Sequence, residues 1–155
     1  MFVSYISTKI GIIKIIATMN EIVFVGITNE IENDTNNNEL TVKCESELFE
    51  YLNGERNHFD LPFKIYATEF EQKVLNCVLK IPYGKTISYK ELAQMVGKPN
   101  GYQAVAKALS KNNILFLVPC HRVILKNGKL GGYKGGELAK QFLINLEKSN
   151  AQKLN

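Results

Sequence analysis

The 155-residue sequence contains little cysteine or histidine, no tryptophan and no long hydrophobic run. Its three cysteines, Cys44, Cys77 and Cys120, are an odd number at wide spacing, which argues against a disulfide framework and favours a reducing compartment. The sequence has only two histidines, His58 and His121, and no Cys-x-x-Cys pair, which argues against a zinc site. We therefore expect no bound metal.

The most apolar early segment is too short to cross a membrane. Residues Ile10 to Ile16 include Lys14, and a bilayer span needs roughly 20 apolar residues. We therefore expect no membrane partner and a cytoplasmic location, or a nuclear one if the source is a eukaryote.

The net charge of +4 is divided unevenly along the chain. Residues 1–66 carry five basic and ten acidic side chains, a net charge of −5, whereas residues 67–155 carry fourteen basic and five acidic ones, a net charge of +9. Such an asymmetry indicates that the basic part meets a polyanion. The length fits one domain or two small ones packed together. Because the net charge changes sign along the chain, we expect a domain boundary between residues 66 and 67. We also expect a monomeric protein.

The beginning of the chain has the pattern of β-strands. The segments Phe2–Ser7, Gly11–Thr18 and Ile22–Thr28 are rich in β-branched and aromatic residues and are separated by short polar turns, which predicts a β-meander. The polar, Asn-rich segment Asn29–Glu39 predicts an exposed loop.

An amphipathic helix is predicted after this loop. Leu40, Cys44, Leu48 and Leu52 recur every four residues, and Gly54 ends the pattern. Cys44 lies on the apolar stripe, so we expect it in the core.

From about Thr68 the apolar residues follow a helical period. One stripe stops at Pro82, and its members are Phe70, Val74, Cys77 or Val78, and Ile81. Cys77 is therefore also expected in the core.

Two short helices follow this stripe and form a helix-turn-helix candidate. Ser88 and Glu91 have the spacing of a capping box that starts the first helix, and the second spans about Gly101 to Lys111. One face of the second helix shows Gln103, Ala106, Lys107 and Ser110, of which Ala106 and Ser110 are small enough for close approach to a partner. A plain helical hairpin is the alternative, and the +9 charge favours nucleic acid.

A buried apolar run, Ile114 to Val118, leads to the sequence Pro119-Cys120-His121-Arg122-Val123. A thiol with a pKa of about 8.5 becomes a strong nucleophile when a nearby base or positive charge favours the thiolate. Cys120 has a histidine and an arginine next to it, so it is a candidate nucleophile; a structural Cys-His pair is the alternative.

The run Pro119–Val123 resembles the active-site sequence of the O6-alkylguanine-DNA alkyltransferases, also called methylated-DNA–protein-cysteine methyltransferases. Further motifs of this family occur in the right order between residues 68 and 148. The first 66 residues match more weakly, mainly through the hairpin from Gly11 to Ile27 and one short motif. These motifs are Ile81-Pro82-x-Gly84-x-Thr86, Ser88-Tyr89-x-x-Leu92-Ala93, Asn112, Gly132-Tyr133, Gly135, Glu147 and, in the weaker part, Tyr51-Leu52-x-Gly54-x-Arg56-x-x-Phe59.

This resemblance implies an α+β or α/β fold with two parts. An RNase H-like amino-terminal domain would precede a helical carboxy-terminal domain with a winged helix-turn-helix. The protein would bind double-stranded DNA through the minor groove and flip an alkylated guanine into a pocket, because the alkylated atom is inaccessible inside the stacked duplex. The alkyl group would pass to Cys120 in a single turnover without a cofactor.

The resemblance also implies roles for individual residues of the catalytic set. His121 would activate Cys120 through a water, and Glu147 would orient that histidine. Asn112 would brace the site, and Tyr89 would donate a hydrogen bond to the flipped base and a proton to the leaving guanine.

Other residues would bind the base or the duplex. The carbonyls of Cys120 and Val123 would accept from the exocyclic amine, and the amide of Lys134, after Tyr133, would face the guanine oxygen. Arg122 would tie the two domains together. The expected DNA-binding residues are Ser88, Gln103, Ala106, Lys107 and Ser110.

The sequence departs from the family at the second helix of the helix-turn-helix. Gln103 stands where the family carries an arginine that inserts into the duplex, Ala106 replaces a glycine, and Asn113 replaces a proline. Glutamine lacks the charge and donor fork of arginine, so we expect weaker DNA binding or slower base flipping than in a typical member.

Three other functions compete with alkyl transfer. A non-repairing alkyltransferase-like protein would lack the cysteine, which is present here. A helix-turn-helix transcription regulator would leave Cys120, His121 and Glu147 without a role. A cysteine hydrolase would need an oxyanion hole, and the sequence indicates none.

Overall fold

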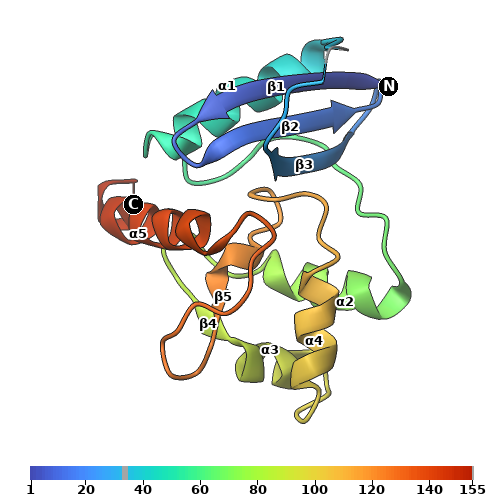
Figure 1. The fold of residues 1–155 in the computed structure, drawn as a ribbon. Helices are drawn as coiled ribbons and strands as arrows, with labels where there is room; N and C mark the ends of the chain where they lie inside the picture. Colours follow the sequence, from blue (N-terminus) through green and yellow to red (C-terminus); the bar gives the residue numbers. More distant parts are fainter. Residues whose placement is uncertain (33–34, 155) are drawn as a thin grey trace.

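The computed structural model describes residues 1–32 and 35–154. Figure 1 shows a sheet with one helix, drawn in blue to teal, lying above a group of helices formed by the rest of the chain. We call residues 1–66 the amino-terminal half and residues 67–155 the carboxy-terminal half.

Three antiparallel strands form the sheet in the order β1-β2-β3: β1 (Phe2–Thr8), β2 (Gly11–Ala17) and β3 (Ile22–Thr28). In β2, fully buried residues alternate with half-buried ones, as expected when successive side chains point to opposite faces. The fully buried residues of β2 are Ile13, Ile15 and Ala17. The predicted meander is therefore confirmed.

Helix α1 (Glu39–Leu52) covers the buried face of this sheet with Cys44, Leu48 and Tyr51. It starts one residue before the predicted Leu40, because Asn38 caps it: the Asn38 side chain accepts from the Thr41 backbone N–H, and the Thr41 side chain accepts from the Asn38 backbone N–H. Residues 33 and 34 of the predicted loop lie outside the described residues.

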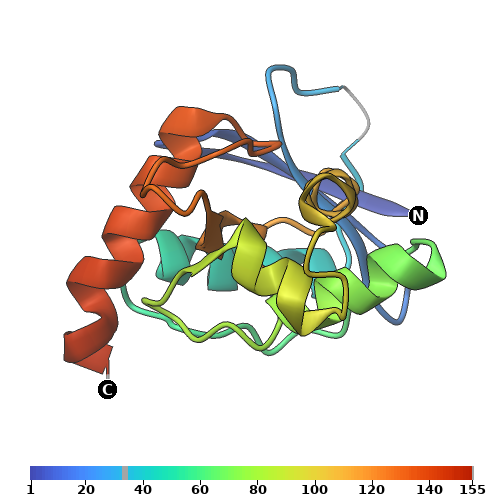
Figure 2. The same ribbon diagram turned by 90° about the horizontal axis from the view of Figure 1, so that it is seen from below.

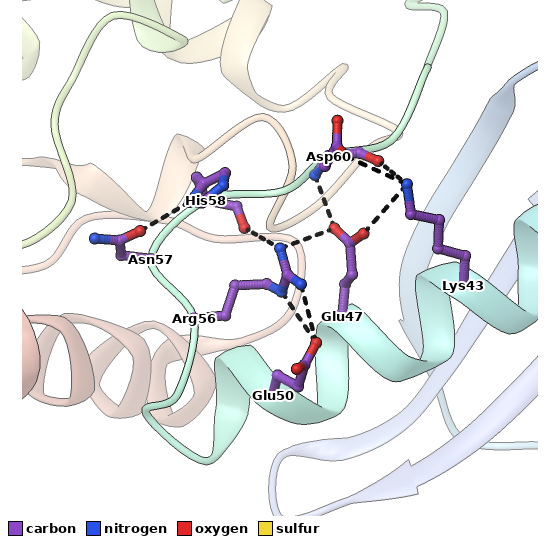
Figure 3. A network of polar contacts seen from close by, with 7 residues as sticks. All are labelled: Lys43, Glu47, Glu50, Arg56, Asn57, His58 and Asp60. Atoms are coloured by element: carbon purple, nitrogen blue, oxygen red, sulfur yellow. Dashed lines mark hydrogen bonds and ion pairs between the residues drawn. The ribbon is translucent and has the colours of Figure 1, made fainter. Parts of the chain in front are cut away.

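A polar network holds the segment after α1 against that helix (Figure 3). Buried Glu47 accepts from the Asp60 backbone N–H at 2.8 Å and pairs with Arg56 and Lys43 at 3.5 and 3.7 Å. Arg56 also binds Glu50 at 3.0 Å. These contacts attach residues 56–60 to α1 and so direct the chain toward the carboxy-terminal half.

The carboxy-terminal half covers part of the free edge of β3. Val25 donates to the Asn113 carbonyl at 2.8 Å and accepts from the Leu115 N–H at 2.9 Å. Pairing of this kind satisfies backbone groups that an edge strand would leave open. It also places Asn112 and the run that follows it directly beside the sheet.

Four helices form most of the carboxy-terminal half: α2 (Glu69–Val78), α3 (Tyr89–Met95), α4 (Tyr102–Leu109) and α5 (Glu137–Leu154). Figure 2 shows α5 along one flank of the molecule, with α3 and α4 turned toward the viewer. Capping boxes start α2 at Thr68 and α3 at Ser88, as the Ser88–Glu91 spacing predicts. Helices α3 and α4 pack against each other as the predicted helix-turn-helix pair.

The cysteine segment lies between these helices. The 3₁₀-helix η1 (Cys120–Arg122) leads into β5 (Val123–Ile124), which pairs in parallel with β4 (Ile87–Ser88). The apolar run before η1 is buried as predicted, and Phe116 within it adopts a φ of 71°, which is rare for a bulky residue. This left-handed residue reverses the chain so that Cys120 enters the core.

Two expectations from the sequence need correction. The polar segment Ser149–Asn155 at the end of the sequence predicts a disordered tail, but α5 continues through Leu154, and Asn155 lies outside the described residues. Cys77 is only half-buried at the margin of the core, whereas Cys44 is fully buried as predicted.

Candidate active site

Cys120 lies at one wall of a cavity of about 320 Å³. The cavity is large enough for a small planar group, since ligand pockets of roughly 300 to 1,000 Å³ are typical of proteins. Its lining residues come from α3, α4, η1 and the loop before α5, and they are Tyr89, Ala106, Leu109, Ser110, Cys120, Gly132, Tyr133 and Lys134.

Asn112 holds the sulfur of Cys120 in place. Its Nδ2 donates to Cys120 Sγ at 3.1 Å and to the Val118 carbonyl at 3.0 Å, and its Oδ1 accepts from the Ile114 N–H at 2.9 Å. All of its contacts are buried, so the amide has a fixed orientation. Burial raises the pKa of the Cys120 thiol, and the Asn112 hydrogen bond opposes that rise.

Behind the cysteine, His121 and Glu147 form a buried pair. His121 Nε2 lies 2.7 Å from Glu147 Oε2, and His121 Nδ1 has no hydrogen-bond partner among the described residues. Burial lowers the pKa of His121, so its ring is neutral at neutral pH. Since Glu147 can only accept, Nε2 carries the hydrogen and Nδ1 carries the lone pair of a base.

Three residues besides His121 donate hydrogen bonds to Glu147. Arg122 Nε and Nη2 lie 2.7 and 3.0 Å from its two oxygens, the Tyr51 hydroxyl donates at 2.5 Å, and the Gly84 N–H donates at 3.3 Å. Burial alone would raise the pKa of Glu147, but His121 and Arg122 overcome it and hold the pKa at about 2.

The structure corrects the expected role of Arg122 as a tie between the two halves. Its guanidinium donates to Glu147 and to the Ile81 carbonyl at 2.7 Å and lies over the Tyr83 ring, and all three partners belong to the carboxy-terminal half. The side chain that reaches Glu147 from the amino-terminal half is Tyr51.

Three of the predicted base-binding residues line the cavity: Tyr89, Tyr133 and Lys134. The Tyr89 hydroxyl faces the Gly132 carbonyl at 3.5 Å, and burial raises the pKa of this phenol. Gly131 has a φ of +75°, and a Cβ there would lie 2.7 Å from the Tyr89 hydroxyl oxygen, so glycine is required at this wall. Lys134 Nζ donates to Asn113 Oδ1 at 2.8 Å.

The predicted DNA-binding residues lie on α4 and at the start of α3. Ala106 and Ser110 line the cavity, and Gln103 and Lys107 are exposed on the same helix. Ser88 is buried, and its hydroxyl accepts from the Glu91 N–H at 3.0 Å as the cap of α3. Val123 is also buried, and its N–H donates to the Cys120 carbonyl.

Sequence reasoning missed two residues of this site, Tyr51 and Lys140. The Lys140 side chain is completely buried, donates to the Gly132 carbonyl at 3.0 Å and lies 5.6 Å from the centre of the Tyr89 ring. No carboxylate forms an ion pair with it in the described part of the chain, and burial lowers its pKa to about 8. A signal was present, because Lys140 lies seven residues before Glu147 and thus on the same helical face.

For Tyr51 the signal was weaker. The residue belongs to a motif of the resembling family and lies on the apolar stripe of α1, where a phenol needs a hydrogen-bond partner once it is buried. The sequence did not indicate which partner, since His121 and Glu147 are far away along the chain.

Residues 1–32 and 35–154 contain neither a candidate group of metal ligands nor a candidate membrane-spanning helix. No three His, Cys, Asp or Glu side chains in these ranges form a group that could hold a metal ion. No helix in these ranges is long and apolar enough to cross a membrane.

The fold and the site define a two-part α/β protein with a buried, hydrogen-bonded cysteine beside a helix-turn-helix. The model of the ribonuclease-like domain of 6-O-methylguanine DNA methyltransferases matches residues 1–65, and that of their DNA-binding domain matches residues 69–149. The chain therefore belongs to the 6-O-methylguanine DNA methyltransferase family, and its two-part fold is the one expected from the resemblance.

Relatives and solved structures agree with this assignment. The probable methylated-DNA–protein-cysteine methyltransferase of Acanthamoeba polyphaga mimivirus is 37% identical over 155 residues, covering 98% of this chain and 100% of the relative. The inducible methyltransferase of that name from Bacillus subtilis is 42% identical over 109 residues, which span 70% of this chain but 61% of the relative. The crystal structure of Mycobacterium tuberculosis OGT in complex with DNA has a TM-score of 0.88 at 34% identity and covers 97% of this chain and 94% of that one.

Proposed function

We propose that this protein repairs DNA by moving the alkyl group of an O6-alkylguanine in double-stranded DNA to Cys120. The observation that carries the proposal is the position of the Cys120 sulfur, which lies at a cavity wall with Asn112 on one side and the His121–Glu147 pair behind it. The relatives named above are methylated-DNA–protein-cysteine methyltransferases, which supports the same reaction.

The reaction is a single displacement at the alkyl carbon. His121 Nδ1 takes the thiol proton through a water, and the thiolate forms a bond to carbon as the carbon–oxygen bond breaks. The electron pair of that bond remains on the guanine, which Tyr89 neutralises with a proton. The product is a thioether that cellular thiols cannot reduce, so each chain acts once and needs no cofactor.

Lys140 supplies the counter-charge for the thiolate. Its buried ammonium has no carboxylate partner in the described part of the chain, and the charge of Cys120 raises the pKa of Lys140 against the effect of burial. A thiolate in this cavity therefore gains a cation that is already desolvated.

Helix α4 binds the duplex next to the cavity. Its exposed Gln103 and Lys107 would meet the DNA backbone and the gap left by the base, while the small Ala106 and Ser110 at the cavity edge let the flipped base pass. The domain boundary between residues 66 and 67, the monomeric state, and the cytoplasmic or nuclear location belong to the same proposal.

The test is an intact-mass measurement after incubation with a duplex that contains one O6-methylguanine. The expected result is a mass gain of one CH₂ per chain that maps to Cys120 and disappears in Cys120→Ala, with Cys44 and Cys77 unmodified. An unchanged mass combined with lesion-selective binding would indicate a non-repairing lesion-binding protein. Sequence-selective binding that ignores the lesion would indicate a regulator.

A further inference from the structure

One hydroxyl from the amino-terminal half reaches the buried pair behind the cysteine. Tyr51 lies in the last turn of α1 and is 1% exposed. Its oxygen is 2.5 Å from Glu147 Oε2 and 3.3 Å from His121 Nε2. The rings of Phe59, Tyr83 and Phe116 lie around the phenol, with centroids 5.2 to 6.4 Å away, so its position is well defined.

The protons in this cluster can be assigned from the acceptor. Glu147 is ionised and can only accept, so both Tyr51 and His121 Nε2 donate to the same oxygen, Oε2. Arg122 Nη2 adds a third donor to that oxygen at 3.0 Å. Burial raises the pKa of Tyr51 well above its ordinary value, so the phenol keeps its proton.

Donors that share one oxygen compete for its electron density. Each hydrogen bond to Oε2 disperses part of the negative charge of Glu147 and so weakens the attraction that would otherwise protonate His121. Because Tyr51 is neutral, it weakens this attraction without adding a positive charge of its own.

We propose that Tyr51 is a positioning residue for alkyl transfer, which fixes Glu147 Oε2 against His121 Nε2 and keeps the imidazole neutral with a free Nδ1. This inference deepens the proposed function and rests on it. The groups that face His121 are Glu147 and Lys140 on α5, Cys120 and Arg122 on η1, Tyr51 on α1 and Tyr133 from the preceding loop.

A consequence concerns the amino-terminal half. Every residue that lines the cavity belongs to the carboxy-terminal half, yet Tyr51 connects the amino-terminal half to the base that activates the cysteine. The rate of alkyl transfer should therefore depend on a hydroxyl that contacts neither the DNA nor the sulfur.

The first test compares Tyr51→Phe with Tyr83→Phe as a matched control. The Tyr83 hydroxyl is buried without a hydrogen-bond partner among the described residues, and its ring packs edge-on against Tyr51. The single-turnover rate of methyl transfer to Cys120 is measured as a function of pH. Neutral His121 is the active form, so the rate falls as pH drops through the pKa of His121.

In Tyr51→Phe the acid limb of this profile should move upward by about one pH unit, which makes transfer about tenfold slower on the acid side. At alkaline pH the rate should equal or exceed that of the wild type. Tyr83→Phe should follow the wild-type profile. An unmoved acid limb in Tyr51→Phe, or the same loss of rate at every pH, would overturn the proposal.

A second variant keeps the ring and the hydroxyl and so avoids a loss of folding. Replacing Tyr51 with 3-fluorotyrosine makes the phenol a stronger donor, so the acid limb should move to lower pH, opposite to the shift in Tyr51→Phe. A shift in the same direction in both variants would overturn the inference.

The titration of His121 separates failure of this inference from failure of the proposed function. NMR of the unreacted protein follows the two histidines of the chain without DNA, and exposed His58 serves as the internal reference. Tyr51→Phe should raise the pKa of His121. If the wild type transfers no methyl group, the proposed function is contradicted. If Tyr51→Phe leaves the titration of His121 unchanged, only the role inferred for Tyr51 is contradicted.

Discussion

Both halves of the molecule bury a carboxylate beside an arginine, but they use it differently. Glu47 in the amino-terminal half is 3% exposed and joins Arg56, Lys43 and the Asp60 backbone, as Figure 3 shows. Glu147 in the carboxy-terminal half is 2% exposed and joins Arg122, Tyr51 and His121. The first network fastens a connecting segment, whereas the second also holds a base whose other nitrogen is free.

The difference shows that a buried ion pair is not by itself a sign of catalysis. What distinguishes Glu147 is the histidine on one of its oxygens and a cysteine beside a cavity next to that histidine. Substitutions at the two carboxylates and around the cavity test this distinction.

The matched pair Glu147→Gln and Glu47→Gln tests the comparison most strongly. Glu147→Gln leaves the Arg122 guanidinium buried without its anion, and breaking such a pair costs about 3 to 5 kcal/mol. It should also slow methyl transfer by about 100-fold, since a neutral amide lacks the charge of the carboxylate and can donate to His121 Nε2, which favours the wrong tautomer. Glu47→Gln should cost about 1 to 2 kcal/mol, because Lys43 and Arg56 can reach solvent, and should leave the transfer rate unchanged.

Chemical denaturation and single-turnover transfer give the two readouts for this pair. Equal losses of transfer rate in both folded variants would contradict the distinction between the two carboxylates.

Lys140→Met tests the buried cation of the carboxy-terminal half. Methyl transfer at neutral pH should slow about tenfold, because the thiolate loses its counter-charge. Stability at neutral pH should rise by about 1 to 2 kcal/mol, since an unpaired ammonium no longer has to be buried. A variant that is less stable and transfers at the wild-type rate would show that Lys140 is purely structural.

The burial of Lys140 also makes the stability of the protein depend on pH. The pKa of Lys140 falls from 10.5 to about 8 on folding, so between these values the unfolded chain holds a proton that the folded chain lacks. The stability of the wild type should therefore rise with pH across this window, and Lys140→Met should lose that rise.

Gly131→Ala and Gly132→Ala compare a position packed against Tyr89 with its neighbour at the cavity wall. A Cβ at Gly131 would lie 2.7 Å from the Tyr89 hydroxyl on a backbone with positive φ, whereas a Cβ at Gly132 meets no atom within 4 Å. Gly131→Ala should cost about 1 to 2 kcal/mol of stability and should slow transfer several-fold by displacing Tyr89. Thermal unfolding and transfer kinetics measure both effects, and equal behaviour of the two variants would contradict this account of the wall.

Gln103→Arg gives the smallest expected effect. It should tighten binding to a lesion-containing duplex by about three- to tenfold, because it restores one charged donor fork on α4. The salt dependence of binding should change little, since it is set by basic residues such as Lys107, Lys111 and Lys126. Unchanged affinity and repair rate would show that position 103 is not used for insertion.

Much of the fold could be predicted because its signals are local. The alternation in β2, the period of α1 and the Ser88–Glu91 box each depend on residues that are close in sequence. The cysteine, its histidine and Glu147 could be found from motifs. The prediction of a disordered tail from Ser149 was wrong, because a polar carboxy-terminal segment carries no local signal that separates a helix from a disordered tail.

The rest depends on contacts between distant segments. The pairing of β3 with residues 113–115, the position of Tyr51 against Glu147 and the left-handed turn at Phe116 join parts of the chain that no periodicity relates. A stripe of residues shows which face of a helix is buried but not what covers it. For the same reason Arg122 was expected to tie the two halves together, whereas its polar partners lie in the carboxy-terminal half.

The most direct test of the central claim follows the alkyl group itself. A duplex with a ¹³C-methyl group on one O6-guanine is mixed with the protein in portions, and the label is located by NMR and mass spectrometry. Alkyl transfer to Cys120 predicts one labelled thioether per chain, on Cys120, and no further uptake from a second portion of DNA. Label that remains on the DNA, or is released as methanol while the mass of the protein stays unchanged, would contradict it.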